Sequence, residues 1–153
     1  MLNSSPRQSG YSKSYARTEA ARLRLASVVA EMRRRRGGLM DFIPRVARGY
    51  TRPEHLAAVA SLFERAFAGE PVFACVSVPP RHGKTEMVLA AIAWWLSRRP
   101  EDALGFVSYA SAFAESKSSR GRDYATAAGV QLHPSRNTLS EWRTTEGGGL
   151  LAT

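Results

Sequence analysis

The sequence predicts an α/β fold in which helices flank a parallel sheet. Residues 72–78 (VFACVSV) form a continuous apolar, β-branched run, which is typical of a strand buried on both faces. Residues 85–99 read as a helix that is apolar nearly all round, and such a helix is expected to be buried against a sheet. Residues 103–110 and 111–129 then repeat the strand and the helix, so this stretch indicates a βαβ unit.

The segments on either side of this unit are predicted in less detail. Residues 1–17 show no periodicity and are expected to be disordered. Residues 18–36 carry Leu and Val at helical spacing behind a threonine that can cap the helix. Residues 53–67 predict a further helix, because a proline at its start is followed by apolar residues on one face. Residues 130–153 contain only short β-like pieces separated by glycine turns.

The positive charge divides the chain into two parts. Residues 1–40 carry eight Arg and one Lys against two Glu, a net charge of +7, whereas residues 41–153 carry only +2. We therefore divide the chain into a basic, partly disordered and partly helical arm (1–40) and a globular body (41–153). Residues 33–36, all arginine, either bind nucleic acid or form the solvated end of a helix. An Arg- and Ser-rich start also resembles an organellar transit peptide, which stays as an alternative.

The overall composition excludes several classes of protein. Hydrophobic residues make up 44% of the 153 residues and charged residues 23%, as in a globular domain. The longest nearly apolar run, residues 87–96, is far shorter than the ~20 residues of a membrane span, and no signal peptide opens the chain. Cys75 has no second cysteine to pair with, which fits a reducing compartment. We expect a protein that is neither secreted nor inserted in a membrane.

The stretch VSVPPRHGKTE (76–86) predicts a phosphate-binding loop. It lies between a predicted strand and a predicted helix, where backbone amides and the helix dipole can meet phosphate oxygens. In this motif Gly83 allows close approach of the backbone and Lys84 reaches the β- and γ-phosphates. Thr85 would ligate Mg²⁺. The predicted cofactors are therefore ATP and Mg²⁺, and the predicted nucleotide-binding residues begin at Pro80 and end at Glu86.

The loop departs from the usual Walker A pattern at its start. Val78 stands where the first glycine is expected, and Pro79 and Pro80 have no amide hydrogen to offer. Any phosphate cradle must therefore use the amides that follow. Arg81 either stabilises charge in the transition state or is an exposed loop charge. His82 is expected to shape the loop through hydrogen bonds rather than to carry protons.

Four stretches in one order carry a family resemblance: GYTRPEHL, VSVPPRHGKTE, FVSYASAFAESKSSRGRDY and WRTTEGGGLLAT. With them, residues 42–153 resemble the large terminase subunit of tailed bacteriophages, the ATP-driven motor that packs DNA into capsids. A double-proline loop of this kind is a familiar variant in that family. The resemblance implies a phosphate-loop NTPase fold, of which the chain is expected to hold an incomplete part.

The resemblance also implies roles for individual residues. Tyr50 and His55, in the GYTRPEHL stretch, would help to hold adenine; packing at a helix start is the alternative. Arg120 and Arg122 match an arginine pair, one of which would act as an arginine finger on a neighbouring subunit's ATP; a solvated helix face is the alternative. The W-x-T-x-x-G-G match, which begins at Trp142, is expected to be structural.

A further set of expectations concerns the complete protein. The acidic motif that positions Mg²⁺ and water, and the nuclease domain, have no counterpart here, so we expect a truncated gene or a partial chain. Such a chain is expected to bind nucleotide weakly, to lack efficient turnover, and to expose an apolar sheet edge that lowers solubility. The family implies double-stranded DNA, a portal protein, a small terminase subunit and a homo-oligomeric ring as partners, in the cytoplasm of the infected bacterial host or of a lysogen.

Two other functions remain open at this stage. One is a different nucleic-acid-directed phosphate-loop ATPase, of the helicase or recombinase kind. The other is a non-enzymatic nucleic-acid-binding protein whose affinity depends on its basic arm and falls steeply with salt.

Overall fold

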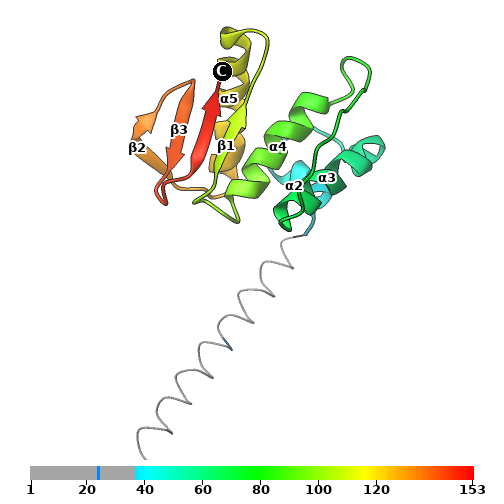
Figure 1. Ribbon diagram of the computed structural model, residues 1–153, viewed down its shortest axis with the longest axis horizontal. Helices are drawn as coiled ribbons and strands as arrows, with labels where there is room; N and C mark the ends of the chain where they lie inside the picture. Colours follow the sequence, from blue (N-terminus) through cyan, green and yellow to red (C-terminus); the bar gives the residue numbers. More distant parts are fainter. Residues whose placement is uncertain (1–23, 25–36) are drawn as a thin grey trace, which may run out of the picture. The chain divides into compact units, whose positions relative to one another are not determined.

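The computed structural model describes Arg24 and residues 37–153. The predictions for the rest of the N-terminal arm, its helix and the arginines at 33–36 included, lie outside the described residues. Residues from Gly37 to Thr153 form one compact unit. This unit is α/β, as predicted, with four α-helices and a four-stranded mixed sheet (Figure 1).

Five helical segments precede or flank the sheet. They are α2 (Leu39–Val46), the 3₁₀ helix η1 (Glu54–Leu56), α3 (Ala57–Phe67), α4 (Lys84–Leu96) and α5 (Ser111–Ala127). The last three confirm the helices predicted around residues 53–67, 85–99 and 111–129. None of the helices among the described residues is both long and apolar enough to cross a membrane.

Helix α2 was not predicted from the sequence. Leu39, Ile43 and Val46 recur at helical spacing and are all buried. The proline inside the helix, Pro44, removes one backbone hydrogen bond, and the burial of the apolar face offsets this loss. The start of α2 is capped from α3, because the Leu39 amide donates to a carboxylate oxygen of Glu64 at 2.7 Å.

Helix α4 is the centre of the core. Eight of its residues are buried, among them Met87, Leu89 and Leu96, which confirms a helix that is apolar nearly all round. Its main neighbours are α5, α2 and α3 (Figure 1). The expectation that α4 is buried against a sheet was wrong, because its main neighbours are helices.

The sheet has the order β1-β4-β3-β2. Strand β1 (Ala103–Phe106) pairs in parallel with β4 (Gly149–Ala152), while β3 (Glu141–Thr144) pairs antiparallel with both β4 and β2 (Leu132–Asn137). The prediction of a parallel sheet was therefore wrong for most of the pairs. The reason is that residues 132–152 fold into three successive antiparallel strands, of which only β4 lies beside β1.

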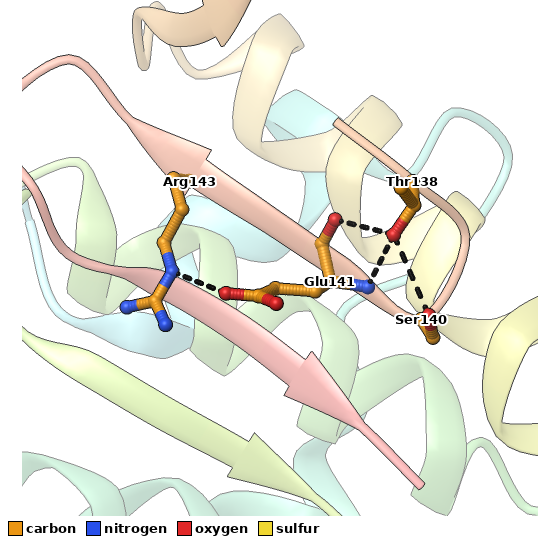
Figure 2. Close-up of polar contacts among 4 residues, drawn as sticks. All are labelled: Thr138, Ser140, Glu141 and Arg143. Atoms are coloured by element: carbon orange, nitrogen blue, oxygen red, sulfur yellow. Dashed lines mark hydrogen bonds and ion pairs between the residues drawn. The ribbon is translucent and has the colours of Figure 1, made fainter. Parts of the chain in front are cut away.

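The β2–β3 hairpin is closed by a polar turn (Figure 2). The Thr138 hydroxyl donates to the Glu141 carbonyl at 2.8 Å and accepts from the Glu141 amide at 2.9 Å. It also lies 3.4 Å from the Ser140 hydroxyl. Within β3 the Glu141 carboxylate pairs with the Arg143 guanidinium at 2.7 Å. The Thr138 hydroxyl thus adds to the backbone hydrogen bond that the Thr138 amide donates to the Glu141 carbonyl at 2.7 Å.

Residues 72–78 do not form the predicted buried strand. Within residues 37–153 the segment pairs with no strand of the sheet, and Phe73 is 98% exposed. An apolar, β-branched run favours a strand only where another backbone lies beside it, since an unpaired strand gains no ladder hydrogen bonds. Apolar surface is also exposed after β1, at Val107 and Tyr109.

The glycine-rich stretch packs closely against the turn before β1. A Cβ on Gly148 would lie 2.3 Å from the carbonyl oxygens of Pro100 and Asp102, so only glycine fits. Trp142 is fully buried and donates to the Ser118 hydroxyl at 3.1 Å, while the buried Thr144 hydroxyl donates to the Pro100 carbonyl. These contacts confirm a structural role for the W-x-T-x-x-G-G pattern.

Candidate functional site

The loop between the extended segment and α4 has an unusual backbone. Arg81 (φ 64°) and Gly83 (φ 80°) both adopt left-handed conformations, and Arg81 is the only non-glycine residue to do so among the described residues. An arginine in this region carries a conformational cost that the surrounding structure must offset. Left-handed residues set between right-handed ones turn successive amides toward one side, which is how backbone anion sites are built.

Gly83 is required by its surroundings as well as by its backbone. A Cβ at this position would lie 1.8 Å from the Tyr50 hydroxyl oxygen. The helix begins directly afterwards, so the amides of Gly83, Lys84 and Thr85 have no acceptor within their own helix. The hydrogen bonds found in residues 37–153 include none that these three amides donate. This helix end can therefore accept an anion.

Two side chains from the segment before α3 hold the loop by its carbonyl groups. The Tyr50 hydroxyl donates to the Gly83 carbonyl at 3.1 Å, and His55 Nε2 donates to the His82 carbonyl at 2.9 Å. His82 Nδ1 in turn donates to the Pro80 carbonyl at 2.9 Å, which fits its predicted role in shaping the loop. Because a carbonyl can only accept, these contacts place the ring protons on His55 Nε2 and His82 Nδ1.

Lys84 and Thr85 begin the helix at the mouth of this loop. The Lys84 ammonium group donates to the Val78 carbonyl at 2.8 Å, so its side chain folds back along the loop. The described residues contain no group of three or more His, Cys, Asp or Glu side chains that could hold a metal ion. The Thr85 hydroxyl, the group predicted to ligate Mg²⁺, lies in the first turn of α4 and lines the same hollow as Lys84.

A polar pocket of about 710 Å³ joins these parts. It is lined by residues 50–53, 55 and 80–86. The structure thus brings together in one hollow every residue predicted to bind the nucleotide, from Tyr50 and His55 on one side to the loop on the other. Burial, together with the charge of Glu86, raises the pKa of Tyr50, so the hydroxyl that holds Gly83 stays protonated at neutral pH.

Glu86 connects this pocket to α5. Its carboxylate accepts a hydrogen bond from the Tyr124 hydroxyl at 2.5 Å and pairs with the Arg120 guanidinium at 3.1 Å. Arg120 Nε also donates to the Tyr124 hydroxyl at 3.1 Å, so the three side chains form a closed cluster. Burial is the main cause that raises the pKa of Tyr124, and the hydrogen bond to Glu86 adds to it.

The two arginines of α5 thus have different surroundings. Arg120 reaches the first turn of α4, whereas Arg122 donates to the Asn137 side chain at 2.9 Å and lies 3.5 Å from the Ser119 hydroxyl. Arg122 is therefore directed toward β2, and neither Arg120 nor Arg122 lines the polar pocket. Tyr124 was not predicted as part of the site. Its position four residues after Arg120, one helical turn away, was the available signal.

A second pocket lies on the other side of the α4 start. Its volume is about 440 Å³ and its walls are mostly apolar, contributed by α3, α4, the extended segment and Phe106. Val72, Ala74 and Val76 line it, so alternate side chains of the unpaired segment face inward as they would in a strand. Lys84 and Thr85 contribute to both pockets.

Comparison with known proteins did not identify relatives. No protein-family model, no curated protein and no solved structure matched the chain.

Proposed function

We propose that residues 37–153 form a nucleotide-binding unit of the phosphate-loop class, and that they belong to a phage terminase large subunit. The observation that carries the proposal is the polar pocket in which Lys84 and Thr85 open a buried helix behind a left-handed loop. The sequence resemblance in four stretches supports the choice of family, and the basic arm is compatible with a DNA-handling protein.

In this proposal each part of the pocket has a chemical task. The amides of residues 83–85 and the Lys84 ammonium group bind the β- and γ-phosphates, and Thr85 ligates Mg²⁺. Arg81, at the exposed tip of the loop, supplies positive charge toward the γ-phosphate. Tyr50 and His55, which already hold the loop, form the wall against which the base would lie.

The complete motor would couple ATP hydrolysis to the movement of double-stranded DNA into the capsid. It would act as a homo-oligomeric ring with a portal protein and a small terminase subunit, in the cytoplasm of the infected host. The unit described here would supply nucleotide binding. The water-positioning acid and the nuclease would come from other parts of the protein.

The test is a titration of the purified chain with a fluorescent ATP analogue and Mg²⁺, with Lys84→Ala as the deficient variant. Lys117→Ala is the matched control, because this lysine lies on α5 outside the polar pocket, against the Phe113 ring. We expect saturable binding in the wild type and in the control, and a loss of at least about tenfold in Lys84→Ala. Equal binding by all three proteins would contradict the proposal.

A non-enzymatic basic protein would give another pattern in the same experiment. Its affinity for duplex DNA would fall steeply with salt. Lys84→Ala would change neither the affinity for DNA nor that for nucleotide.

A further inference from the structure

The cluster of Glu86, Arg120 and Tyr124 joins the candidate site to helix α5 through polar contacts. Both oxygens of the Glu86 carboxylate have partners on α5: Arg120 at Oε1 and Tyr124 at Oε2. The Glu86 side chain is 20% exposed and that of Arg120 is 54% exposed, so water screens the pair in part from the Arg120 side. The contact joins residues 38 positions apart and fixes the first turn of α4 against α5.

The position of Glu86 presents an electrostatic problem for an anion site. Glu86 follows Lys84 and Thr85 directly and lines the same polar pocket. The Glu86 charge also acts on the loop. Burial raises the pKa of Tyr50 most, and the negative charge of Glu86 raises it further; the Tyr50 hydroxyl in turn donates to the Gly83 carbonyl. An uncompensated carboxylate at this place would repel the phosphates of a nucleotide.

We propose that Arg120 is a positioning residue that neutralises Glu86 in the same chain and so permits a polyanionic nucleotide to bind at the loop. This inference rests on the proposed function. It assigns to Arg120 a role within its own subunit, at the far side of the pocket wall, rather than on the nucleotide of a neighbour. Tyr124 completes the cluster, because its hydroxyl hydrogen-bonds to both charged groups and fixes their relative orientation.

The charge argument predicts a rescue that a purely structural role does not. Arg120→Ala leaves Glu86 without its cation, and we expect ATP-analogue binding to weaken roughly five- to tenfold. The double variant Arg120→Ala/Glu86→Gln removes the remaining negative charge, and we expect its affinity to return to within about twofold of the wild type. Glu86→Gln alone keeps an acceptor for Tyr124 and is expected to bind at least as tightly as the wild type.

The experiment titrates the full chain and these variants with the ATP analogue and Mg²⁺, under conditions where sedimentation shows monomers. Lys117→Ala serves again as the control for the loss of a cation from α5. Wild-type affinity in Arg120→Ala, or a double variant as weak as the single one, would overturn the inference while leaving the proposed function intact. Should Arg120→Ala fail to fold, weaker binding by Glu86→Gln would overturn it instead.

A failure of the proposed function has a different signature in this titration. The wild type would then not bind the analogue, or Lys84→Ala would bind as well as the wild type, and both proposals would be rejected together.

Discussion

The two sides of helix α4 show opposite degrees of packing. On one side α4 contacts α5, where Leu89 lies within 3.5 Å of the place that a Cβ on Gly121 would occupy. On the other side the neighbouring segment is the extended stretch 72–78, which leaves an apolar pocket between itself, α3 and Phe106. The same apolar helix thus has one face in a close-packed interior and part of another beside a gap.

The difference teaches that apolar sequence supplies the driving force for burial but does not determine the backbone pairing. Both 72–78 and 103–106 are apolar runs, yet only the second has a paired strand, β4, beside it. A strand contributes to stability through the hydrogen bonds and side-chain pairs it makes with neighbours, so the unpaired run remains exposed.

The largest predicted effect compares Trp142, which packs on β3 against α5, with Phe73 of the unpaired segment. Trp142→Ala should lower the free energy of unfolding by about 3–5 kcal/mol, because it removes a fully buried ring and its hydrogen bond to Ser118. Phe73→Ala should change it by less than about 0.5 kcal/mol, since Phe73 is almost completely exposed. Urea unfolding followed by circular dichroism measures both, and similar losses would mean that Phe73 is packed in solution.

A second pair of substitutions compares two glycines with positive φ. Gly149 (φ 145°) lies in β4, and a Cβ there would lie 2.2 Å from the Trp142 carbonyl oxygen. At Gly69 (φ 96°), which follows the end of α3, a Cβ would have no atom within 4 Å, so only backbone strain opposes alanine. We expect Gly149→Ala to cost more than about 2 kcal/mol and Gly69→Ala about 1 kcal/mol.

Thermal or urea unfolding of these two variants separates steric contact from backbone strain. A cost for Gly69→Ala equal to that of Gly149→Ala would show that the end of α3 is as closely packed as the sheet.

The contrast also explains which elements could be predicted from the sequence. Helix α4 has a nearly uniform apolar pattern that indicates a buried helix locally, and α5 was predicted as the second helix of a βαβ unit. The existence of both helices therefore followed from the sequence. The predicted strand at 72–78 is absent and the sheet is mostly antiparallel. Both outcomes depend on which segments meet in space, and no local sequence pattern determines this. Helix α2 was missed because Pro44 argues against a helix, whereas its tertiary burial outweighs the local cost.

In the candidate site, too, some features could be predicted from the sequence and others depend on long-range packing. The order Gly83, Lys84, Thr85 between an apolar run and a helix was enough to locate the loop that lines the polar pocket. The hydrogen bonds from Tyr50 and His55 to the loop follow from long-range packing and were not predicted from residue patterns alone. Likewise, the contact of Arg120 with Glu86 requires the α4–α5 packing, which the sequence does not encode locally.

A smaller effect is expected at alkaline pH on the packed side of α4. The pKa of Tyr124 is raised by burial and by the hydrogen bond to Glu86, so the native state holds the phenol proton more tightly than the unfolded state. The resulting stabilisation is fully present below the unfolded pKa of about 10 and is lost as the pH rises through the higher folded value. Tyr124→Phe should therefore be less sensitive to pH above about 10 than the wild type.

Urea titrations at several pH values measure this difference, with Tyr109→Phe as the control for an exposed tyrosine near the open region. Identical pH dependence in the wild type and Tyr124→Phe would show that Tyr124 titrates alike in the folded and unfolded chains.

The smallest effect on stability is expected where α3 is followed by the extended residues 70–78. Arg65 pairs with Glu70 at 2.7 Å, and both side chains are about half exposed, at 55% and 51%. Water and salt screen such a pair, so Arg65→Ala should lower the free energy of unfolding by less than about 0.5 kcal/mol. The difference should disappear in about 1 M NaCl, where the screening length is only ~3 Å. A loss of more than about 1 kcal/mol that persists in salt would mean that this ion pair anchors residues 70–78, and the open side of α4 would then be more ordered in solution than its exposure indicates.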